Sequence, residues 1–256
     1  MWKSLDRYLG RGSYYWLKDR IHPDREYTQL TYARLIDEVL TPQTRWLDAG
    51  GGHQILEVAT PDMELALVKR ARLAVCCDRV VDAIAKHRSI SIGVGAALDH
   101  LPFRSESLDL ITLNNVAEHL ERPREVLSEF ARVLAPGGRV IIHTPNVSSY
   151  AVRVAELGRR ILPKPFIMEL IRYMDFREEE DVFPTYYRAN TCADLDAAAG
   201  HAGLSIEKVL LAPARPLFYF IAPLSAAELA ASRLLIRLGA ERFAASVILA
   251  VFRKPA

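Results

Sequence analysis

Residues 45–54 read RWLDAGGGHQ, an apolar pair followed by an acid and three glycines. The Trp–Leu pair is typical of the end of a buried strand, and Asp48 stands where that strand stops. Glycine has no Cβ, so Gly50 and Gly52 can adopt a positive φ and let a ligand approach the backbone closely. A strand, a glycine turn and a helix in this order aim backbone N–H groups and the positive end of a helix dipole above the turn. The pattern predicts a site for a nucleoside-bearing ligand with an anionic part, with a simple tight turn as the alternative.

A second acid ends the next apolar stretch. Residues 73–77 read LAVCC and predict a strand, which Asp78 follows directly. In nucleoside-binding α/β folds an acid at the tip of the second strand accepts hydrogen bonds from the ribose hydroxyls. Asp78 is also suited to cap the helix predicted over residues 79–87, and the two roles can coexist. The interval from the glycines to Asp78 is longer than the roughly 20 residues usual in dinucleotide folds, so we expect an extra turn in the first crossover. Its helix is predicted over residues 55–70, with a break at Pro61.

The rest of the chain alternates apolar strands with helices. Further strands are predicted at residues 90–95, 107–115, 139–146, 205–211 and 246–254, and helices at residues 124–134, 192–201 and 226–238. Strands that are apolar on both faces and alternate with helices predict an α/β fold, doubly wound, with a mostly parallel sheet and helices on both faces. Ligands of such sheets bind beyond the carboxyl ends of the strands. The polar residues that fall there are Asp48, Asp78, Asp99 and Asn114.

Composition narrows the class of protein. The chain has 256 residues, 50% of them hydrophobic, so it can bury the core of one domain. Its net charge is +2 without a polybasic run, and nucleic acid is not an expected partner. Cys76 and Cys77 point to opposite faces of their strand, and no Cys/His cluster has ligand spacing, which predicts no metal site. Neither a signal peptide nor an apolar run of membrane-spanning length is found, which favours the cytoplasm.

Several motifs in order resemble a known family. The stretches are LDAGGG (47–52), LPF (101–103), LD (108–109), EHL (118–120) and LAPGG (134–138). The first resembles the D-x-G-x-G signature of class I S-adenosylmethionine-dependent methyltransferases. The others resemble the "LPF…FD…EH" region and the "LKPGG" turn of the type 11-like subgroup, which includes quinone and small-molecule methyltransferases. The resemblance covers residues 44–146 well. It implies a single domain over residues 1–256, a seven-stranded sheet whose last strand is antiparallel, and S-adenosylmethionine as the cofactor.

The resemblance also implies roles for the residues around the glycines. Asp48, with the turn from Gly50 to Gly52, would hold the methionine part of the cofactor, whose amino and carboxylate groups need partners of opposite charge. Asp78 would bind the ribose hydroxyls.

The residues expected to contact the adenine differ from the family's usual pattern. The family's usual acid before "LPF" would stand at Ala97, so either Asp99, two residues later, or the backbone of Leu98 would make the adenine contact. Asn114 and Asn115 would line the floor beneath the sulfonium.

The segments outside this core are read from their composition. Residues 1–40 are predicted to be helical, lying either across the ligand cleft or against the sheet edge. The C-terminal part, residues 205–256, reads strand–helix–strand. Its apolar stretch at residues 213–223, with the basic helix that follows, is either plain core or a surface for peripheral membrane contact or a lipid-like acceptor. The oligomeric state is not readable from the sequence.

An insertion follows the fifth strand, over residues 147–190. It contains predicted helices at residues 151–162 and 166–173 and an acidic run at residues 178–181. A connection of this length is usually functional or mobile, and insertions here commonly cap the acceptor site in the family. Tyr186, Tyr187 and Arg188 are therefore the candidate substrate-binding residues, with a solvated surface excursion as the alternative.

The chemistry of methyl transfer needs few catalytic groups. Displacement at a sulfonium methyl is in line and already activated, so holding the acceptor on line supplies much of the catalysis. A base is needed only for an acceptor such as a hydroxyl, and His143 and His119 are the candidates, each with a structural role as the alternative. The acceptor is expected to be a small molecule, a glycan or a lipid-linked intermediate. Two other functions stay open, a non-catalytic nucleoside-binding regulator and a dinucleotide-dependent oxidoreductase, although the third glycine of G-x-G-x-x-G is missing.

Overall fold

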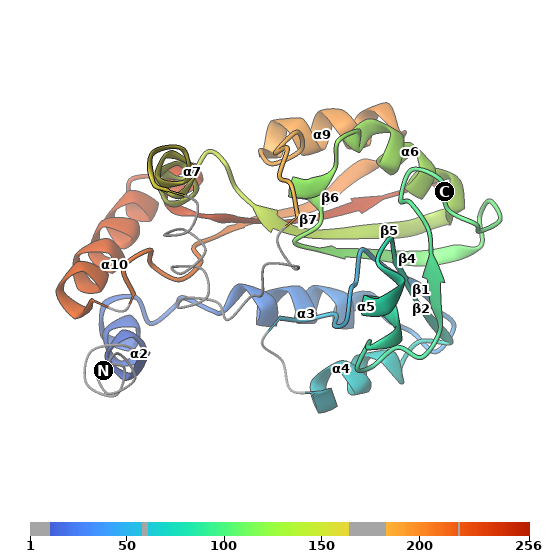
Figure 1. Ribbon diagram of the computed structural model, residues 1–256, viewed down its shortest axis with the longest axis horizontal. Helices are drawn as coiled ribbons and strands as arrows, with labels where there is room; N and C mark the ends of the chain where they lie inside the picture. The colour runs from blue at the N-terminus through green and yellow to red at the C-terminus, as the bar shows by residue number, and fades with distance from the viewer. Residues whose placement is uncertain (1–10, 58–60, 164–182, 220) are drawn as a thin grey trace. The chain divides into compact units, whose positions relative to one another are not determined.

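The computed structural model describes residues 11–57, 61–163, 183–219 and 221–256 (Figure 1). The chain forms two compact units, each built from three stretches. The first unit takes Met1–Glu26, Asn146–Pro184 and Leu211–Val247, and the second takes Tyr27–Pro145, Thr185–Leu210 and Ile248–Ala256. A single domain over residues 1–256 with an inserted cap at residues 147–190 stays a prediction.

A seven-stranded sheet is the frame of the second unit. Its order is β3-β2-β1-β4-β5-β7-β6, and only the last strand of the chain runs antiparallel to the others. The strands are β1 (Arg45–Ala49), β2 (Leu73–Asp78), β3 (Gly93–Gly95), β4 (Leu108–Asn114), β5 (Leu134–Pro145), β6 (Ser205–Ala212) and β7 (Val247–Arg253). This confirms the doubly wound, mostly parallel sheet with an antiparallel last strand that the sequence predicted.

The chain order reverses at β1, which fixes where a ligand would bind. Strand β1 pairs in parallel with β2 on one side and with β4 on the other, so that Asp48 lies level with Cys76 and Thr112. Parallel sheets of this kind bind ligands at such a switch point, beyond the carboxyl ends of the strands. The glycine turn after β1 stands at this place.

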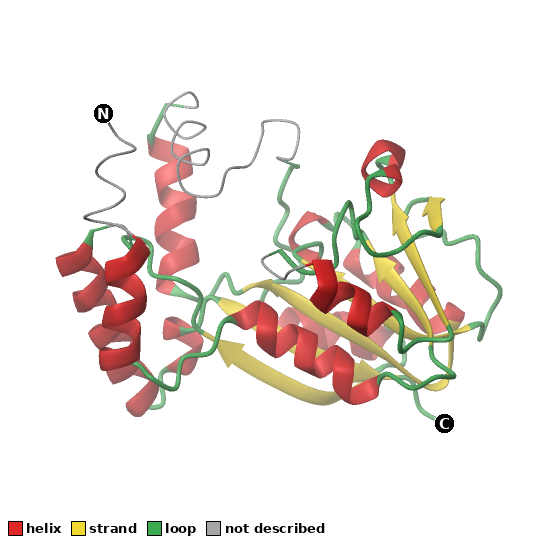
Figure 2. Cartoon of the chain, turned by 90° about the horizontal axis from the view of Figure 1, so that it is seen from below, coloured by secondary structure: helices red, strands yellow, loops and turns green. Residues whose placement is uncertain are grey.

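Helices cover both faces of the sheet (Figures 1 and 2). On one face lie α6 (Pro123–Val133) and α9 (Cys192–His201), and on the other lie α3 (Thr28–Val39) and α4 (Pro61–Val68). A short helix, α5 (Val81–Ala85), contacts β2 and β3. Helix α6 begins with a proline, whose fixed φ suits a first helical turn. The helix buries one apolar face, which is formed by Val126, Leu127, Phe130 and Val133.

The stretch after the glycines differs from its prediction. A helix was predicted over residues 55–70 with a break at Pro61, but α4 begins at Pro61. Ile55 and Leu56 are fully buried in irregular backbone, and the N–H group of Leu56 donates to the Glu64 carboxylate at 2.8 Å. Proline is favoured at the start of a helix, so Pro61 marks its beginning instead of a break.

The first unit contains helices α2 (Arg11–Ile21), α7 (Tyr150–Ile161), α10 (Ala222–Arg237) and α11 (Glu241–Ala244). Tyr14, Tyr219 and Leu229 form a small core in it. Ser149 caps α7 by accepting from the backbone N–H of Val152 at 3.3 Å.

The predicted helix at residues 166–173 and the acidic run at residues 178–181 lie outside the described residues. In the described part of the chain, none of the helices combines the length and apolar character needed to cross a bilayer. Membrane-surface contact stays a prediction.

Candidate functional site

The glycine turn has the backbone conformation that the sequence predicted. Gly50 has φ of +69° and donates its N–H to the carbonyl of Cys77 at 2.7 Å, which ties the turn to the end of β2. A Cβ on Gly50 would collide with the side chain of Val116. Gly52 has φ of +53°, and no atom of the described residues lies within 4 Å of where its Cβ would stand. The turn is thus packed at its first glycine and open at its third.

Asp78 lies beside the open end of this turn. Its carboxylate accepts the N–H of Gly52 at 3.0 Å and the N–H of Val80 at 2.9 Å, and the side chain is half-buried. Helix α5 has Val80 at its N-cap without a side-chain cap, so Asp78 does not cap it. The acid therefore combines a fixed position against the turn with access to solvent.

Asp48 lies in a different environment from the one the sequence predicted. Only 1% of its surface is exposed, and its carboxylate accepts the hydroxyl of Thr112 at 2.8 Å. The other carboxylate oxygen lies beneath Gly51, where a Cβ would collide with it. Burial raises the pKa of Asp48, while His87 and Thr112 act to lower it. Asp48 supports the turn from below, and direct contact with a ligand stays a prediction.

Asn114 is bound by a helix that the site prediction did not include. Its amide exchanges two hydrogen bonds with the amide of Gln29, at 2.9 and 2.8 Å, and also donates to the carbonyl of Ile55 at 2.9 Å. Gln29 is the second residue of α3 and is almost fully buried. Its burial among Thr28 and Thr31 is visible only in the structure, and a buried amide of this kind needs a hydrogen-bond partner. Helix α3 thus belongs to the site's wall.

Asn115 and His143 form a second polar pair. Asn115 has φ of +54° and donates its amide to the carboxylate of Glu57 at 2.7 Å. The His143 ring lies 3.2 Å from the Asn115 amide oxygen through Nδ1 and 3.1 Å from the Thr28 hydroxyl through Nε2. Burial lowers the pKa of His143 to about 4. The ring is therefore neutral at pH 7 and a weak base, although its catalytic role stays untested.

The predicted acceptor residues lie against the loop that follows β4. The N–H groups of Tyr186 and Tyr187 both donate to the carbonyl of Glu118, at 2.8 and 3.1 Å. The Arg188 guanidinium donates to the carbonyl of Glu121 at 2.7 Å and lies 5.6 Å from the ring of Tyr186. This loop contains the single-turn helix η1 (Ala117–His119). His119 therefore lies in sequence between Glu118 and Glu121, the two residues whose carbonyl groups bind the Tyr186 segment.

Glu118 holds that arrangement together. Its carboxylate is buried and accepts the hydroxyl of Thr144 at 2.9 Å, and Asn190 donates its amide to the same hydroxyl at 2.8 Å. The structure thus brings the last residues of the insertion, 186–190, to the carboxyl ends of β4 and β5. The sequence motif contained Glu118, but only its burial reveals this role.

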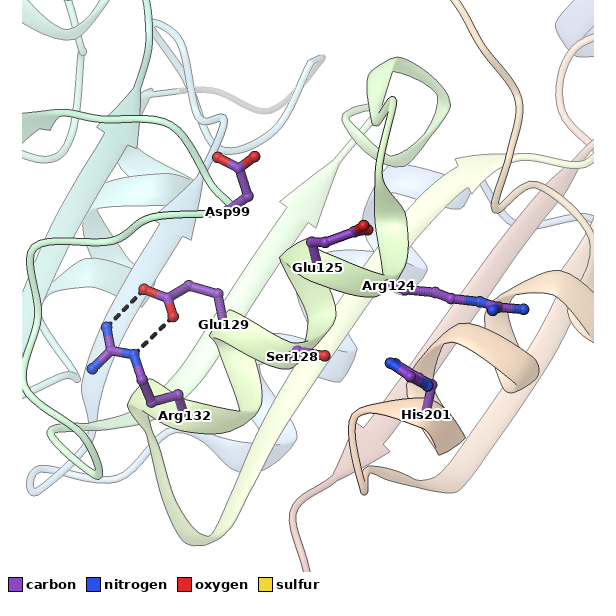
Figure 3. A pocket seen from close by; sticks show the side chains of 7 residues that line it. All are labelled: Asp99, Arg124, Glu125, Ser128, Glu129, Arg132 and His201. Carbon is purple, nitrogen blue, oxygen red and sulfur yellow. Dashed lines mark hydrogen bonds and ion pairs between the residues drawn. The ribbon is translucent and has the colours of Figure 1, made fainter.

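Asp99 is bound by an arginine. Its carboxylate accepts from the Arg122 guanidinium at 2.7 Å. It lines a shallow polar hollow over α6 and α9, where the side chains of Glu129 and Arg132 pair with each other (Figure 3). Leu98, next to it, is half-buried. The adenine contact of Leu98 or Asp99 stays a prediction.

A known family of proteins matches the part of the chain that contains this site. Residues 44–142 match the family model described as "Methyltransferase domain". Over these residues the chain carries a methyltransferase domain. It contains the glycine turn, both acids and the paired asparagines.

Two curated relatives extend the match. A demethylmenaquinone methyltransferase of Corynebacterium efficiens is 32% identical over 136 residues, which are 50% of this chain and 59% of that protein. A ubiquinone biosynthesis O-methyltransferase of Xanthomonas axonopodis pv. citri is 24% identical over 218 residues, 80% of this chain and 82% of that protein. The chain thus spans less than two thirds of the first of these relatives.

A solved structure supports the fold alone. An S-adenosylmethionine-dependent methyltransferase from Methanosarcina mazei superposes with a TM-score of 0.54 at 13% identity, covering 86% of this chain and 97% of that one. Because one fold hosts many activities, the methyltransferase domain's chemistry has to be argued from its site.

Proposed function

We propose that this chain is an S-adenosylmethionine-dependent methyltransferase that acts on a small molecule of the quinone type. The observation that supports it most is the half-exposed carboxylate of Asp78 beside the open backbone of Gly52, at the switch point of the sheet. An acid at this place suits the ribose hydroxyls of a nucleoside, and a turn without side chains lets the rest of the ligand lie close to the backbone.

Different residues around the turn would contact different parts of the cofactor. Asp78 would accept from the ribose, the turn at Gly52 would face the methionine part, and the segment with Leu98 and Asp99 would meet the adenine. Asn114 and Asn115 would line the floor beneath the sulfonium. When bound, the cofactor supplies an activated methyl group, and the chain's own task is to hold the acceptor on line with it.

The proposed acceptor class rests on the relatives and on the last residues of the insertion. One relative is named for demethylmenaquinone and the other for ubiquinone biosynthesis, and both compounds are quinones. Tyr186 is 43% exposed and has Arg188 over its ring, so the pair offers an aromatic face and a cation to a planar, oxygen-bearing molecule. Because the pKa of His143 is about 4, we expect an acceptor that needs no strong base, with His119 as the alternative base. Glycan and lipid-linked acceptors are the competing classes.

Methyl transfer from labelled S-adenosylmethionine tests the proposal. The acceptor panel contains demethylated quinones, a glycan and a lipid-linked sugar, and we expect label in the quinone fraction only. Asp78→Asn should abolish most of the turnover, whereas Asp82→Asn, which changes an exposed acid of α5, should leave it intact. Tyr186→Ala should raise KM for the acceptor without changing the affinity for S-adenosylhomocysteine.

The outcomes separate the rival functions. Cofactor binding without turnover of any acceptor would favour the non-catalytic regulator. Binding of NAD in place of S-adenosylhomocysteine in calorimetry would favour the oxidoreductase. Label in the glycan or lipid fraction would keep the methyltransferase and correct its substrate.

A further inference from the structure

A histidine lies buried beneath the glycine turn without a place in the site as predicted. The side chain of His87 is 0% exposed. Its Nδ1 atom accepts the backbone N–H of Ser89 at 3.3 Å and of Ile90 at 3.0 Å. An imidazole nitrogen that accepts carries no proton, so the proton of the neutral ring is on Nε2. The fold therefore selects one tautomer of His87.

The protonated nitrogen faces the acid under the turn. Nε2 of His87 lies 3.8 Å from Oδ2 of Asp48, and neither atom has a hydrogen-bond partner among the residues that the structure describes. This separation is longer than a hydrogen bond. In a buried, low-dielectric place an N–H dipole nevertheless favours the charged form of a carboxylate opposite it. The two unpartnered atoms thus face each other as an N–H donor and a carboxylate acceptor.

The same segment is fastened to the far end of the glycine loop. The N–H of Arg88 donates to the carbonyl of His53 at 3.0 Å, and its guanidinium donates to the carbonyl of Leu56 at 2.7 Å. The guanidinium also pairs with Glu64 at 2.5 Å. The loop is therefore held from below at Asp48 and from the side at residues 53–56, by consecutive residues of one segment.

We infer that His87 is a positioning residue for the cofactor site: its Nε2–H holds the Asp48 carboxylate under Gly51 and so fixes the turn that faces the ligand. This rests on the proposed function. His87 touches no ligand, and it acts through Asp48 and the turn, whose third glycine donates its N–H to Asp78.

The other described groups near Asp48 do not replace His87. Cys76 from β2, Tyr32 from α3 and Glu64 from α4 bring no positive charge, and among the residues that the structure describes only Thr112 donates a hydrogen bond to Asp48. Asp48, Cys76 and His87 have ligand atoms within 4.8 Å of one another, as a metal site would. A metal would need the nitrogen that carries the proton, because Nδ1 already accepts two backbone N–H groups, so we do not assign one.

Two variants of His87 test the inference by calorimetry with S-adenosylhomocysteine between pH 5 and pH 8. His87→Phe keeps an aromatic ring but removes both the Nε2 donor and the Nδ1 acceptor of Ser89 and Ile90, and we expect the affinity to fall about tenfold. The acid limb of the binding profile should also move to higher pH, because Asp48 without a facing donor takes up a proton more readily. His87→Gln offers an amide donor and should recover part of the affinity. Leu67→Ala, a core change in α4, is the control: it should lower stability and leave the profile in place.

A long-range ¹H–¹⁵N spectrum of the wild-type protein measures the tautomer directly, without any variant. Protonation on Nε2 is expected, and protonation on Nδ1 would overturn the inference. It would also be overturned if His87→Phe bound S-adenosylhomocysteine with the wild-type affinity and pH profile. If the wild-type protein bound none, the proposed function itself would fail, which is a different result from binding that ignores residue 87.

Discussion

Two acids end neighbouring strands in this protein, and their surroundings give them different chemistry. Asp48 is buried under Gly51 and bound by Thr112, whereas Asp78 is half-buried and bound by the N–H of Gly52. A buried carboxylate costs free energy to charge, so its value lies in the structure that it supports. A half-exposed one can exchange its partners for those of a ligand. At the residue scale Asp78 is thus the group that we expect to contact the cofactor.

The first prediction concerns Asp78. Asp78→Asn removes the charge that would accept from the ribose, and hydrogen bonds to charged groups contribute about 1.5–3 kcal/mol. We expect the affinity for S-adenosylhomocysteine to fall about 10- to 100-fold in calorimetry. Asp82→Asn is the matched control and should bind as the wild type does. Equal affinities of the two variants would remove Asp78 from the site.

The second prediction concerns His143. Its folded-state pKa of about 4 lies below the ordinary value of about 6.5. The unfolded chain therefore takes up the proton first as the pH falls, so the stability that His143 contributes is complete above about pH 6.5 and is lost on the way to pH 4. The full loss amounts to about 3 kcal/mol.

Urea unfolding at pH 7 and pH 4.5 measures this loss. His143→Gln, which does not titrate, should lose less stability between the two pH values than the wild-type protein. Identical losses would mean that the ring is not held neutral in the folded state.

At the scale of elements, the glycine loop is an irregular segment held by side chains instead of by a helix. Gly51 leaves room for the Asp48 carboxylate, and Glu64 binds the N–H of Leu56 and the guanidinium of Arg88. Burial alone would raise the pKa of Glu64, but Arg88, Leu56 and Ser89 more than offset it and the pKa is lowered. The loop thus depends on a charge network from α4 and from the segment after α5.

The third prediction adds one methyl group to this loop. Gly51→Ala places a Cβ against Oδ2 of Asp48 and 3.1 Å from the sulfur of Cys76, both buried. Overpacking of this kind costs about 1–3 kcal/mol, which urea unfolding should detect. Gly200→Ala in α9 is the control, because no atom of the described residues lies within 4 Å of its Cβ position. There alanine should be neutral or stabilise by up to about 1 kcal/mol. A Gly51→Ala protein as stable as Gly200→Ala would contradict the packing described here.

The fourth prediction breaks the buried ion pair. Glu64→Gln leaves the Arg88 guanidinium without its charge partner, and loss of one member of such a pair costs about 3–5 kcal/mol. The free energy of unfolding measures it. Arg139→Gln, which breaks a more exposed pair with Glu207, should cost no more than about 1 kcal/mol. Similar costs for the two pairs would show that burial does not set the value of the first.

At the scale of the whole molecule, the sequence predicts the sheet well and the site only in outline. Alternating apolar strands and helices have few ways to pack, so the parallel order and the antiparallel last strand follow from the pattern and the family resemblance. The pattern also predicts that the polar site residues lie at the carboxyl ends of the strands.

Partners that come from distant parts of the chain were not predictable. Gln29 reaches Asn114, Glu118 anchors the Tyr186 segment, and His87 faces Asp48. Each is a buried polar contact between elements far apart in sequence, and no local spacing encodes such contacts. The start of α4 was also misjudged, because a proline at a helix start and one at a helix break look alike in sequence.

The fifth prediction concerns stability of the folded chain with ligand. A ligand that binds only the folded state stabilises it by about 2.7 kcal/mol at 100 times its Kd. For a protein of this size we expect S-adenosylhomocysteine to raise Tm by about 5–10 °C in calorimetric melting. NAD at the same concentration should leave Tm unchanged. A shift with NAD alone would favour the oxidoreductase.

The most direct test of the central claim is a crystal structure of this protein with S-adenosylhomocysteine bound. The account predicts the ribose hydroxyls within hydrogen-bond distance of the Asp78 carboxylate, the methionine part over Gly52, and Asp48 still buried beneath Gly51. A ligand bound away from this turn, or one whose ribose has no contact with Asp78, would contradict it.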